Sequence, residues 1–330
     1  MKAIIPVAGA GKLLRPHTYT QPKPLIPVAG KPILGHIIEN LLNAGIKDQI
    51  FVVGYLKEKI QDYVLSTYKS TVNATFIEQT PRHGLAHALW VCRDQIKKAQ
   101  EILIVLGDTI FDQETKEVLR IKGSVLVVHE VDNPREFGIA VTDSKGYVSE
   151  VKEKPEIPIS NLALTGLYKI DQIPKLLESL ESTIPNPLEE GEEYPLPDAL
   201  MHMIHEGVKF KAHRAENWFD CGRTSTLLEA NKILLQRHQS KKLPKFHNVV
   251  YIPPVYLAPN CHIENAIIGP NVAVGEFANI KYSIVKDSIL GAYSTLKNVT
   301  LTHSIVGNDT RLHGKSSSVN LGDNTEIDLG

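Results

Sequence analysis

The chain has 330 residues, 42% of them hydrophobic and 22% charged, which is long enough for two domains and for a core that needs no disulfide or structural metal. Its 36 Lys plus Arg and 37 Asp plus Glu give a net charge of −1, which argues against a protein that coats nucleic acid or an anionic membrane. Cys92, Cys221 and Cys261 form no CxxC pair, so we expect free thiols. The N-terminal apolar run is too short for a signal peptide or membrane span, and we expect a cytoplasmic protein.

The first third of the chain alternates strand and helix signals. Residues 3–8 form an apolar run that ends in Gly9, as a buried strand does. Pro32 then opens a helix whose apolar residues recur with a 3.6-residue period until Gly45. The following segments predict strands at 49–53, 74–78 and 102–106 and helices at 58–65 and 85–95. This rhythm predicts an α/β, Rossmann-like, mostly parallel sheet with helices on both faces.

Similar signals continue to about residue 236. Strands are predicted at 125–129, 139–142, 148–151, 163–170 and 208–213, and helices at 172–180, 197–205 and 224–236. The polar, basic stretch 239–245 then reads as a linker. We therefore predict a first domain over 1–238, a linker over 239–248 and a second domain over 249–330.

The second domain has a different pattern, in which one apolar residue recurs every five or six positions. The recurring residues are Leu257, Ile263, Ile268, Val274, Ile280, Val285, Leu290, Leu296, Leu301, Val306 and Leu312. A period near six is typical of a parallel β-helix, whereas an ordinary antiparallel domain would show a period of two. This part resembles the left-handed hexapeptide-repeat solenoids, and we expect a short β-helix that takes part in a homo-oligomer.

The loop after the first strand reads G-A-G-K-L-L-R-P over residues 9–16. Glycines at such a position let backbone N–H groups approach phosphates closely. Leu14 stands where the dinucleotide fingerprint needs glycine, and Leu13 stands where a Walker A loop needs Ser or Thr, so neither motif is present. Cations at Lys12, Arg15 and Lys23 suit the charge of a triphosphate, although a solvated basic loop would look the same.

Six segments in this order resemble the sugar-1-phosphate nucleotidylyltransferases, most closely their glucose-1-phosphate thymidylyltransferase branch. They are the glycine loop with P-K-P-L at 22–25, Q-T-P-R-H-G-L-A-H-A at 79–88, L-G-D at 106–108, V-K-E-K-P at 151–155, S-N-L-A-L-T-G-L-Y at 160–168 and W-F-D-C-G at 218–222. The resemblance covers about residues 3–235. It implies that an NTP reacts with a sugar 1-phosphate to give an NDP-sugar and pyrophosphate. The 84–88 segment resembles that of enzymes that use dTTP or UTP, and the 160–168 segment resembles that of enzymes that use glucose 1-phosphate.

The same resemblance assigns roles to individual residues. The metal would be Mg²⁺ on Asp108 and Asp220, because hard carboxylate oxygens are its usual protein ligands. The amide of Gln79 has both a donor and an acceptor for a base edge. The resemblance assigns catalysis to Lys12, Arg15, Lys23, Lys154 and Asp108. It assigns nucleotide binding to Gly9, Ala10, Gly11 and Gly84 together with Gln79. It assigns sugar binding to Gly138, Glu153, Lys154 and Thr165.

One departure from the family pattern leaves alternatives open. The family loop carries a T-R pair where this chain has Lys12-Leu13, and leucine cannot replace that arginine as a triphosphate contact. A nucleotide-sugar-binding regulatory protein with weak catalysis is one alternative, and a mannose-1-phosphate guanylyltransferase is another. Related solenoids include acyltransferases, for which the bases here would be His262, His303 and His313.

Overall fold

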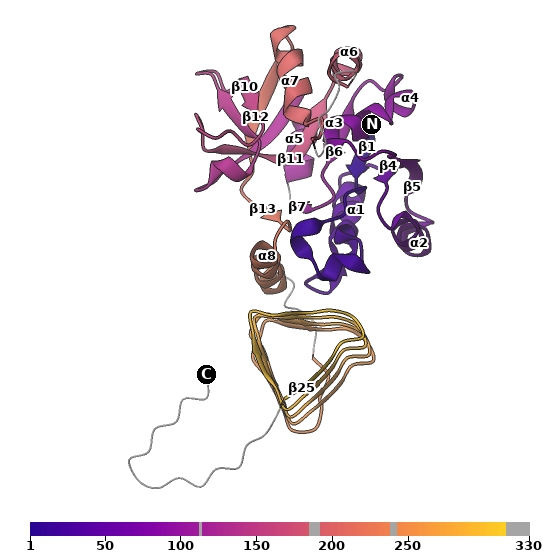
Figure 1. Cartoon of the computed structure of the whole chain (residues 1–330), viewed down its shortest axis with the longest axis vertical. Helices are drawn as coiled ribbons and strands as arrows, with labels where there is room; N and C mark the ends of the chain where they lie inside the picture. The colour runs from indigo at the N-terminus through magenta and orange to yellow at the C-terminus, as the bar shows by residue number, and fades with distance from the viewer. Residues whose placement is uncertain (112–113, 185–191, 238–242, 315–330) are drawn as a thin grey trace. The chain divides into compact units, whose positions relative to one another are not determined.

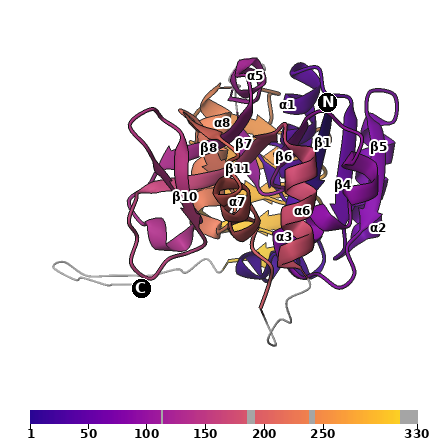
Figure 2. The ribbon, with the colours of Figure 1, turned by 90° about the horizontal axis from the view of Figure 1, so that it is seen from above.

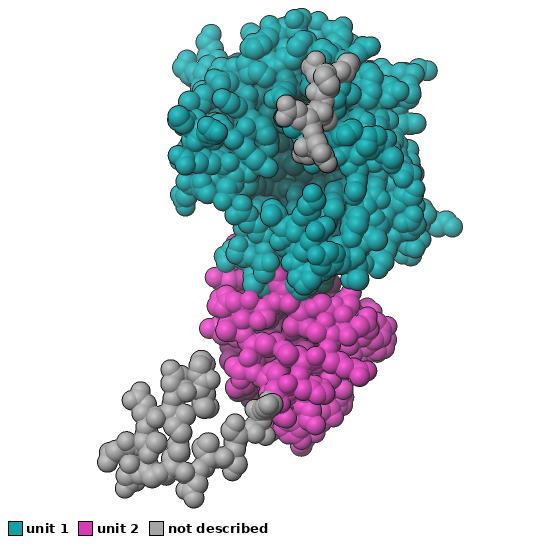
Figure 3. All heavy atoms as spheres, in the orientation of Figure 1, with its two compact units in different colours: residues 1–27, 31–230 teal, residues 28–30, 231–330 magenta. Residues whose placement is uncertain are grey.

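The computed structural model describes residues 1–111, 114–184, 192–237 and 243–314. The chain divides into two compact units, unit 1 with residues 1–27 and 31–230 and unit 2 with residues 28–30 and 231–330 (Figure 3). Residues 239–242 of the predicted linker and 315–330 of the predicted second domain lie outside the described residues. Where the chain is described, it has no helix with the length and apolar character needed to cross a membrane, and Cys92, Cys221 and Cys261 are free thiols.

Unit 1 is built on a nine-stranded sheet in the order β10-β9-β11-β6-β1-β4-β5, with β8 beside β11 and β12 beside β8. The strands are β1 (Lys2–Pro6), β4 (Asp48–Val53), β5 (Asn73–Glu78), β6 (Ile102–Val105), β8 (Ser124–Glu130), β9 (Ile139–Thr142), β10 (Val148–Lys152), β11 (Leu162–Ile170) and β12 (Phe210–Arg214). The run β6-β1-β4-β5 is parallel, whereas β11 is antiparallel to its neighbours. The sheet is therefore mixed, because connections such as the one from β9 to β10 are too short for a parallel crossover.

Helices cover the sheet on both faces, which confirms the predicted α/β class. On one face Ile4, Ile102 and Ile104 share a core with helices α3, α6 and α7 (Figure 2). Residues that alternate with these, such as Ile5 and Leu103, are equally buried on the other face. The helices are α1 (Ile33–Asn43), α2 (Lys57–Tyr68), α3 (Gly84–Trp90), α4 (Arg93–Ile96), α5 (Glu114–Arg120), α6 (Ile173–Thr183), α7 (Leu196–His205) and α8 (Thr224–Arg237).

Several short elements differ from the prediction. The helix expected over 85–95 is two helices, α3 and α4. Strands β7 (Thr109–Phe111) and β13 (Trp218–Asp220), which pair with each other, were not predicted, and neither was α5. Single turns of 3₁₀ helix occur at η1 (Lys12–Leu14), η2 (His17–Tyr19), η3 (Lys23–Leu25) and η4 (Pro134–Glu136), and β2 (Pro27–Val28) pairs with β3 (Lys31–Pro32).

Unit 2 is a β-helix made of three parallel four-stranded sheets, whose coils enclose a triangular section (Figure 1). The predicted repeat is confirmed in register. Leu257 pairs with Val274 and Val274 with Leu290, and the same relation holds for every predicted apolar residue and the third one after it. The sheets are β14 (Val249–Tyr251), β17 (Ala266–Ile268), β20 (Ile284–Lys286) and β23 (Thr300–Thr302); β15 (Val255–Leu257), β18 (Val272–Val274), β21 (Ile289–Leu290) and β24 (Ile305–Val306); and β16 (His262–Glu264), β19 (Asn279–Lys281), β22 (Thr295–Lys297) and β25 (Arg311–His313).

Candidate active site

The candidate site lies where the parallel strands of unit 1 end. The loop with Gly9 and Gly11 follows β1, Gln79 follows β5, and Asp108 follows β6. Because β6, β1, β4 and β5 run parallel as neighbours, their carboxyl ends meet at one edge of the sheet. This edge is where open α/β sheets bind ligands.

The glycine loop is shaped so that Lys23 lies beneath it. Gly11 has a φ of +61°, and a Cβ at that position would lie 2.8 Å from Cβ of Lys23. The Thr18 hydroxyl donates a hydrogen bond to the Gly11 carbonyl at 2.9 Å, and Leu14 is buried behind the turn. Glycine is therefore required both by the backbone angle and by the space.

Two charged motifs that are far apart in sequence meet beside this loop. Lys23 Nζ lies 2.7 Å from Asp108 Oδ2 in an ion pair. Strand β13 pairs with β7, so that Asp220 lies opposite Thr109, and the Cys221 N–H donates to the Asp108 carbonyl at 2.9 Å. The L-G-D and W-F-D-C-G segments therefore place both predicted metal ligands at one point.

The pKa directions follow from this arrangement. Burial raises the pKa of Asp108, but the Lys23 ammonium outweighs burial and holds that pKa below its usual range. Burial lowers the pKa of Lys23, and Asp108 and Asp220 more than reverse this effect. The pKa of Asp220 is raised by burial and by the neighbouring Asp108 charge. Asp108 and Asp220 thus interact electrostatically with each other and with the Lys23 ammonium.

This donor set fits a divalent cation that also binds substrate phosphates. The Gly222 N–H donates to Asp220 Oδ1 at 2.9 Å and holds that carboxylate in place. A divalent cation would relieve the repulsion that raises the pKa of Asp220. The described residues contain no group of three or more His, Cys, Asp and Glu side chains that could hold an ion alone. Mg²⁺ commonly binds through one or two carboxylates and completes its shell with phosphates and water.

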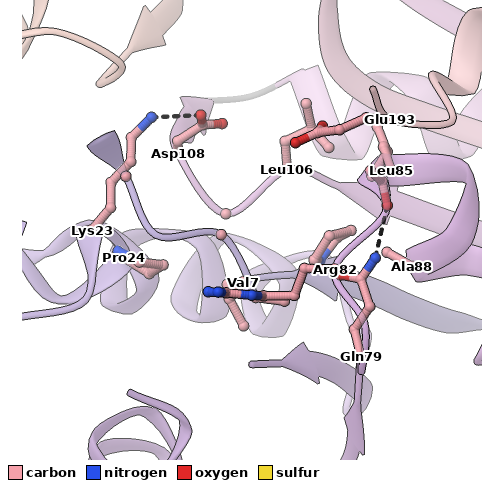
Figure 4. A pocket seen from close by; sticks show the side chains of 16 residues that line it. Val7, Lys23, Pro24, Gln79, Arg82, Leu85, Ala88, Leu106, Asp108 and Glu193 are labelled. Atoms are coloured by element: carbon pink, nitrogen blue, oxygen red, sulfur yellow. Dashed lines mark hydrogen bonds and ion pairs between the residues drawn. The ribbon is translucent and has the colours of Figure 1, made fainter. Parts of the chain in front are cut away.

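The first cavity has a volume of about 340 Å³ and is lined by several residues that were predicted to bind nucleotide (Figure 4). Of the predicted residues, Gly9, Gly11, Gln79 and Gly84 line it, and Lys23 and Asp108 lie at its end. The Gln79 side chain is 4% exposed and donates from Nε2 to the Gly84 carbonyl at 2.8 Å. Two segments predicted to bind nucleotide are therefore joined by a direct hydrogen bond.

The second cavity, of about 680 Å³, contains all four residues predicted to bind sugar. They are Gly138, Glu153, Lys154 and Thr165. Burial raises the pKa of Glu153, and Lys154, whose Nζ lies 3.7 Å away, opposes this shift. The Thr165 hydroxyl donates to the Val127 carbonyl at 3.0 Å, so its oxygen is left as an acceptor. Lys23 and Asp108 line this cavity as well as the first, so the two cavities adjoin there.

Two predicted catalytic cations lie elsewhere. Lys12 and Arg15 are exposed and line neither cavity, and the Arg15 guanidinium lies 5.0 Å above the Tyr19 ring. Ala10 lines neither cavity as well, whereas Leu13 is 70% exposed and lines the second. Leu14 is the buried residue of the turn η1, and its other two residues, Lys12 and Leu13, are exposed.

Several residues at the cavities were not predicted, and three of them bear on the chemistry. Arg82 lines the first cavity. It lies in the 79–88 segment of the family resemblance, where a cation without an assigned role could have indicated it. Trp218, two residues before the predicted Asp220, lines the second cavity, and its ring centroid lies 5.3 Å from that of Phe137 in an edge-on contact. Glu193 lines both cavities and follows an acidic run that carries no recognisable motif.

The three histidines considered as acyltransferase bases, all in unit 2, are exposed. His262 lies on β16, His303 at the corner after β23, and His313 on β25. The Thr302 hydroxyl lies 2.9 Å from Nδ1 of His303, and His313 pairs in register with Lys297. The three histidines lie on different strands or corners, so they do not form one cluster that could act as a catalytic base.

Known proteins support the family that the motifs predicted. The chain is 41% identical over 242 residues, 72% of its length, to the bifunctional protein GlmU of Methanocaldococcus jannaschii, of which it covers 55%. It is 34% identical over 66% of its length to the UTP–glucose-1-phosphate uridylyltransferase AglF of Haloferax volcanii, of which it covers 89%. A Bacillus anthracis structure assigned as a glucose-1-phosphate thymidylyltransferase, in complex with a sucrose, matches 74% of this chain and 98% of its own, with a TM-score of 0.62 and 25% identity. Residues 2–237 match the family model described as nucleotidyl transferase, and the chain therefore belongs to the nucleotidyl transferase family.

Proposed function

We propose that the protein is a Mg²⁺-dependent nucleotidylyltransferase that converts an NTP and a sugar 1-phosphate to an NDP-sugar and pyrophosphate. The proposed NTP is UTP or dTTP, and the proposed sugar 1-phosphate is glucose 1-phosphate. One observation carries this proposal: two cavities with different linings adjoin at Lys23 and Asp108. A reaction that joins a nucleotide to a sugar phosphate needs two such sites with charged groups between them. Within this proposal residues 1–238 form the catalytic domain and 249–330 a β-helix domain.

The chemistry places the reacting phosphorus near the shared residues. An oxygen of the sugar phosphate attacks the α-phosphorus of the NTP, the bond from that phosphorus to the bridging oxygen breaks, and pyrophosphate leaves with the bonding electrons. No proton transfer is needed, so the residues mainly supply position and charge. Lys23 is the cation at the junction, and Lys154, with 62% of its side chain exposed in the second cavity, is available to the incoming sugar phosphate.

Asp108 and Asp220 would hold the Mg²⁺. When bound, the ion would neutralise charge on the triphosphate and the leaving pyrophosphate. Asp108 also keeps Lys23 in place through the 2.7 Å ion pair, and the Gly222 N–H fixes the rotation of Asp220. Both carboxylates therefore have supporting contacts before any ligand arrives.

Arg82 supplies the cation that Leu13 does not. Its guanidinium extends across the first cavity toward Val7 (Figure 4) and lies 5.8 Å from the Tyr55 ring centroid. Its Cδ lies 3.1 Å from where a Cβ on Gly54 would be, so the side chain rests on a bare stretch of backbone after β4. Arginine presents a planar fork that suits phosphate oxygens, which fits it to the triphosphate.

The test is a matrix of NTPs against sugar 1-phosphates, with pyrophosphate release as the readout and with Mg²⁺ varied. Release with UTP or dTTP and glucose 1-phosphate, lost in Asp108→Asn but kept in Arg15→Ala, supports the proposal. Release only with GTP and mannose 1-phosphate would replace it with the guanylyltransferase. No release with any pair at any Mg²⁺ concentration overturns it.

A binding protein with little turnover is the second candidate. The observation that favours it is Leu13, an exposed apolar side chain on the second cavity where the family carries arginine. Calorimetry that shows nucleotide-sugar binding together with pyrophosphate release near background would favour this second function over the first.

A further inference from the structure

The amide of Gln79 is held in one orientation by two acceptors. Its Nε2 donates to the Gly84 carbonyl at 2.8 Å and lies 3.3 Å from Nδ1 of His87. A carbonyl oxygen only accepts, so the Gly84 contact identifies the nitrogen of the amide. Within the described residues Oε1 of Gln79 has no hydrogen-bond partner, although the side chain lines the first cavity. The buried glutamine therefore presents an acceptor, and no donor, to whatever occupies that cavity.

His87 can hold this orientation only as a neutral ring. Since Nδ1 faces the N–H of Gln79, it must be the unprotonated nitrogen, and the ring proton stays on Nε2. A protonated ring would point an N–H of its own at Nε2 of Gln79. The amide would then lose one of its two acceptors, or rotate and turn its oxygen toward the carbonyl of Gly84.

The surroundings keep the ring neutral. Burial lowers the pKa of His87, and the neighbouring His83 lowers it further, while a hydrogen bond to the Pro81 backbone opposes both effects. The His83 ring centroid is 5.7 Å from that of His87, and Tyr194, from the segment before α7, packs edge-on against His83 at 6.2 Å. Glu193 lies next to Gly84, where a Cβ would be 2.8 Å from the Glu193 Cβ.

We propose that His87 is a positioning residue that keeps Oε1 of Gln79 facing the cavity, so that the site selects a nucleobase with an imide N–H, uracil or thymine, over cytosine. The proposal places N3 of the base opposite Oε1, where uracil and thymine donate their N3 proton, whereas N3 of cytosine is itself an acceptor and forms no hydrogen bond. This inference rests on the proposed function for the location of the nucleotide. It adds a residue that acts through Gln79 and a pH dependence of base selection.

The size of the effect follows from one hydrogen bond. A buried polar atom left unpaired weakens binding by roughly fivefold to 150-fold, which is equivalent to about 1–3 kcal/mol. We therefore expect UTP to bind about tenfold more tightly than CTP at a pH above 6.5, the ordinary pKa of histidine. The preference should fall as the pH drops through the lowered pKa of His87, because the protonated ring no longer accepts from the amide.

The test measures the ratio of the Kd values for CTP and UTP by calorimetry on the full chain, at several pH values above and below 6.5. Both nucleotides carry the same triphosphate, so titration of the phosphates cancels in the ratio. The matched variants are His87→Asn, whose Oδ1 can replace Nδ1 as an acceptor but does not titrate, and His83→Asn, which changes a neighbouring ring that does not contact Gln79. His87→Phe removes the acceptor.

The inference expects a preference that declines in acid for the wild type and for His83→Asn, stays constant for His87→Asn, and is reduced at every pH for His87→Phe. A ratio that does not change with pH in the wild type overturns it, as does an unchanged acid loss in His87→Asn. Pyrophosphate release is measured in parallel. Equal binding of CTP and UTP together with release overturns this inference alone, whereas absence of binding by both nucleotides overturns it together with the proposed function.

Discussion

Replacement of Arg82 by alanine tests whether this cation acts in catalysis or only stabilises the fold. Arg82 lines the first cavity, and among the described residues its guanidinium has one ring contact, Tyr55 at 5.8 Å, a distance at which an exposed cation–π pair contributes about 0.5–1 kcal/mol. Since no ion pair is broken among the described residues, we expect the free energy of unfolding to fall by no more than about 1 kcal/mol. The loss of one charged contact to a triphosphate should instead lower kcat/KM by roughly 10²–10³.

The assay is pyrophosphate release at saturating sugar 1-phosphate, with urea denaturation of the same samples. Arg15→Ala is the matched control, because Arg15 belongs to the same resemblance but stacks on Tyr19 away from both cavities. Arg82→Lys should recover only part of the loss, since an ammonium lacks the guanidinium fork. The account of the triphosphate site is refuted if Arg82→Ala keeps full kcat/KM, or if Arg15→Ala loses as much.

Four further changes test other parts of the site. Asp220→Ala should raise the Mg²⁺ concentration for half-maximal rate by at least about tenfold in magnesium titrations. Because the pKa of Asp220 is raised, the Mg²⁺ concentration that the wild type needs should also increase as the pH falls. An unchanged Mg²⁺ concentration in the variant argues against Asp220 as a ligand. Glu153→Gln should raise KM for the sugar 1-phosphate by about tenfold with little change in KM for the NTP, and an equal rise in both would contradict its placement in the second cavity. Leu13→Arg should leave kcat/KM nearly unchanged, because Arg82 already supplies a charge on the first cavity, and a rise of roughly tenfold or more would contradict that role of Arg82. Gly11→Ala should lower the free energy of unfolding in urea by about 1–2 kcal/mol, since its φ of +61° and the nearby Lys23 leave no room for a Cβ; unchanged stability would contradict that reading.

The sequence predicts the β-helix down to its register because the signal is local and repeated. Each coil sends apolar side chains inward, such as Ile263 and Ile280, and these pair directly in the structure. The apolar stripe of α1 is equally local, and Ile33, Ile37 and Leu41 are all buried. Where one face of an element is covered, its periodicity is sufficient to locate it.

The parts that were not predicted depend on contacts between distant segments. Strands β7 and β13 have only three residues each, and the pairing of Phe111 with Trp218 joins positions that no periodicity relates. In the site, Lys23 and Gln79, both chosen from the motifs, line the first cavity. Lys12, chosen from the same loop, lines neither cavity, and Arg82, which lines the first cavity, carried no assigned role, because the sequence does not show where either side chain lies.

The most direct measurement follows the phosphorus atoms of the substrate. UTP or dTTP labelled at the α-phosphate is incubated with glucose 1-phosphate and Mg²⁺, and the products are separated. We predict that the label appears in the NDP-sugar while the released pyrophosphate is unlabelled, because the sugar phosphate attacks the α-phosphorus between the two cavities. Label recovered in a nucleoside monophosphate, or label that remains in the triphosphate for every NTP and sugar 1-phosphate combination, would contradict the account.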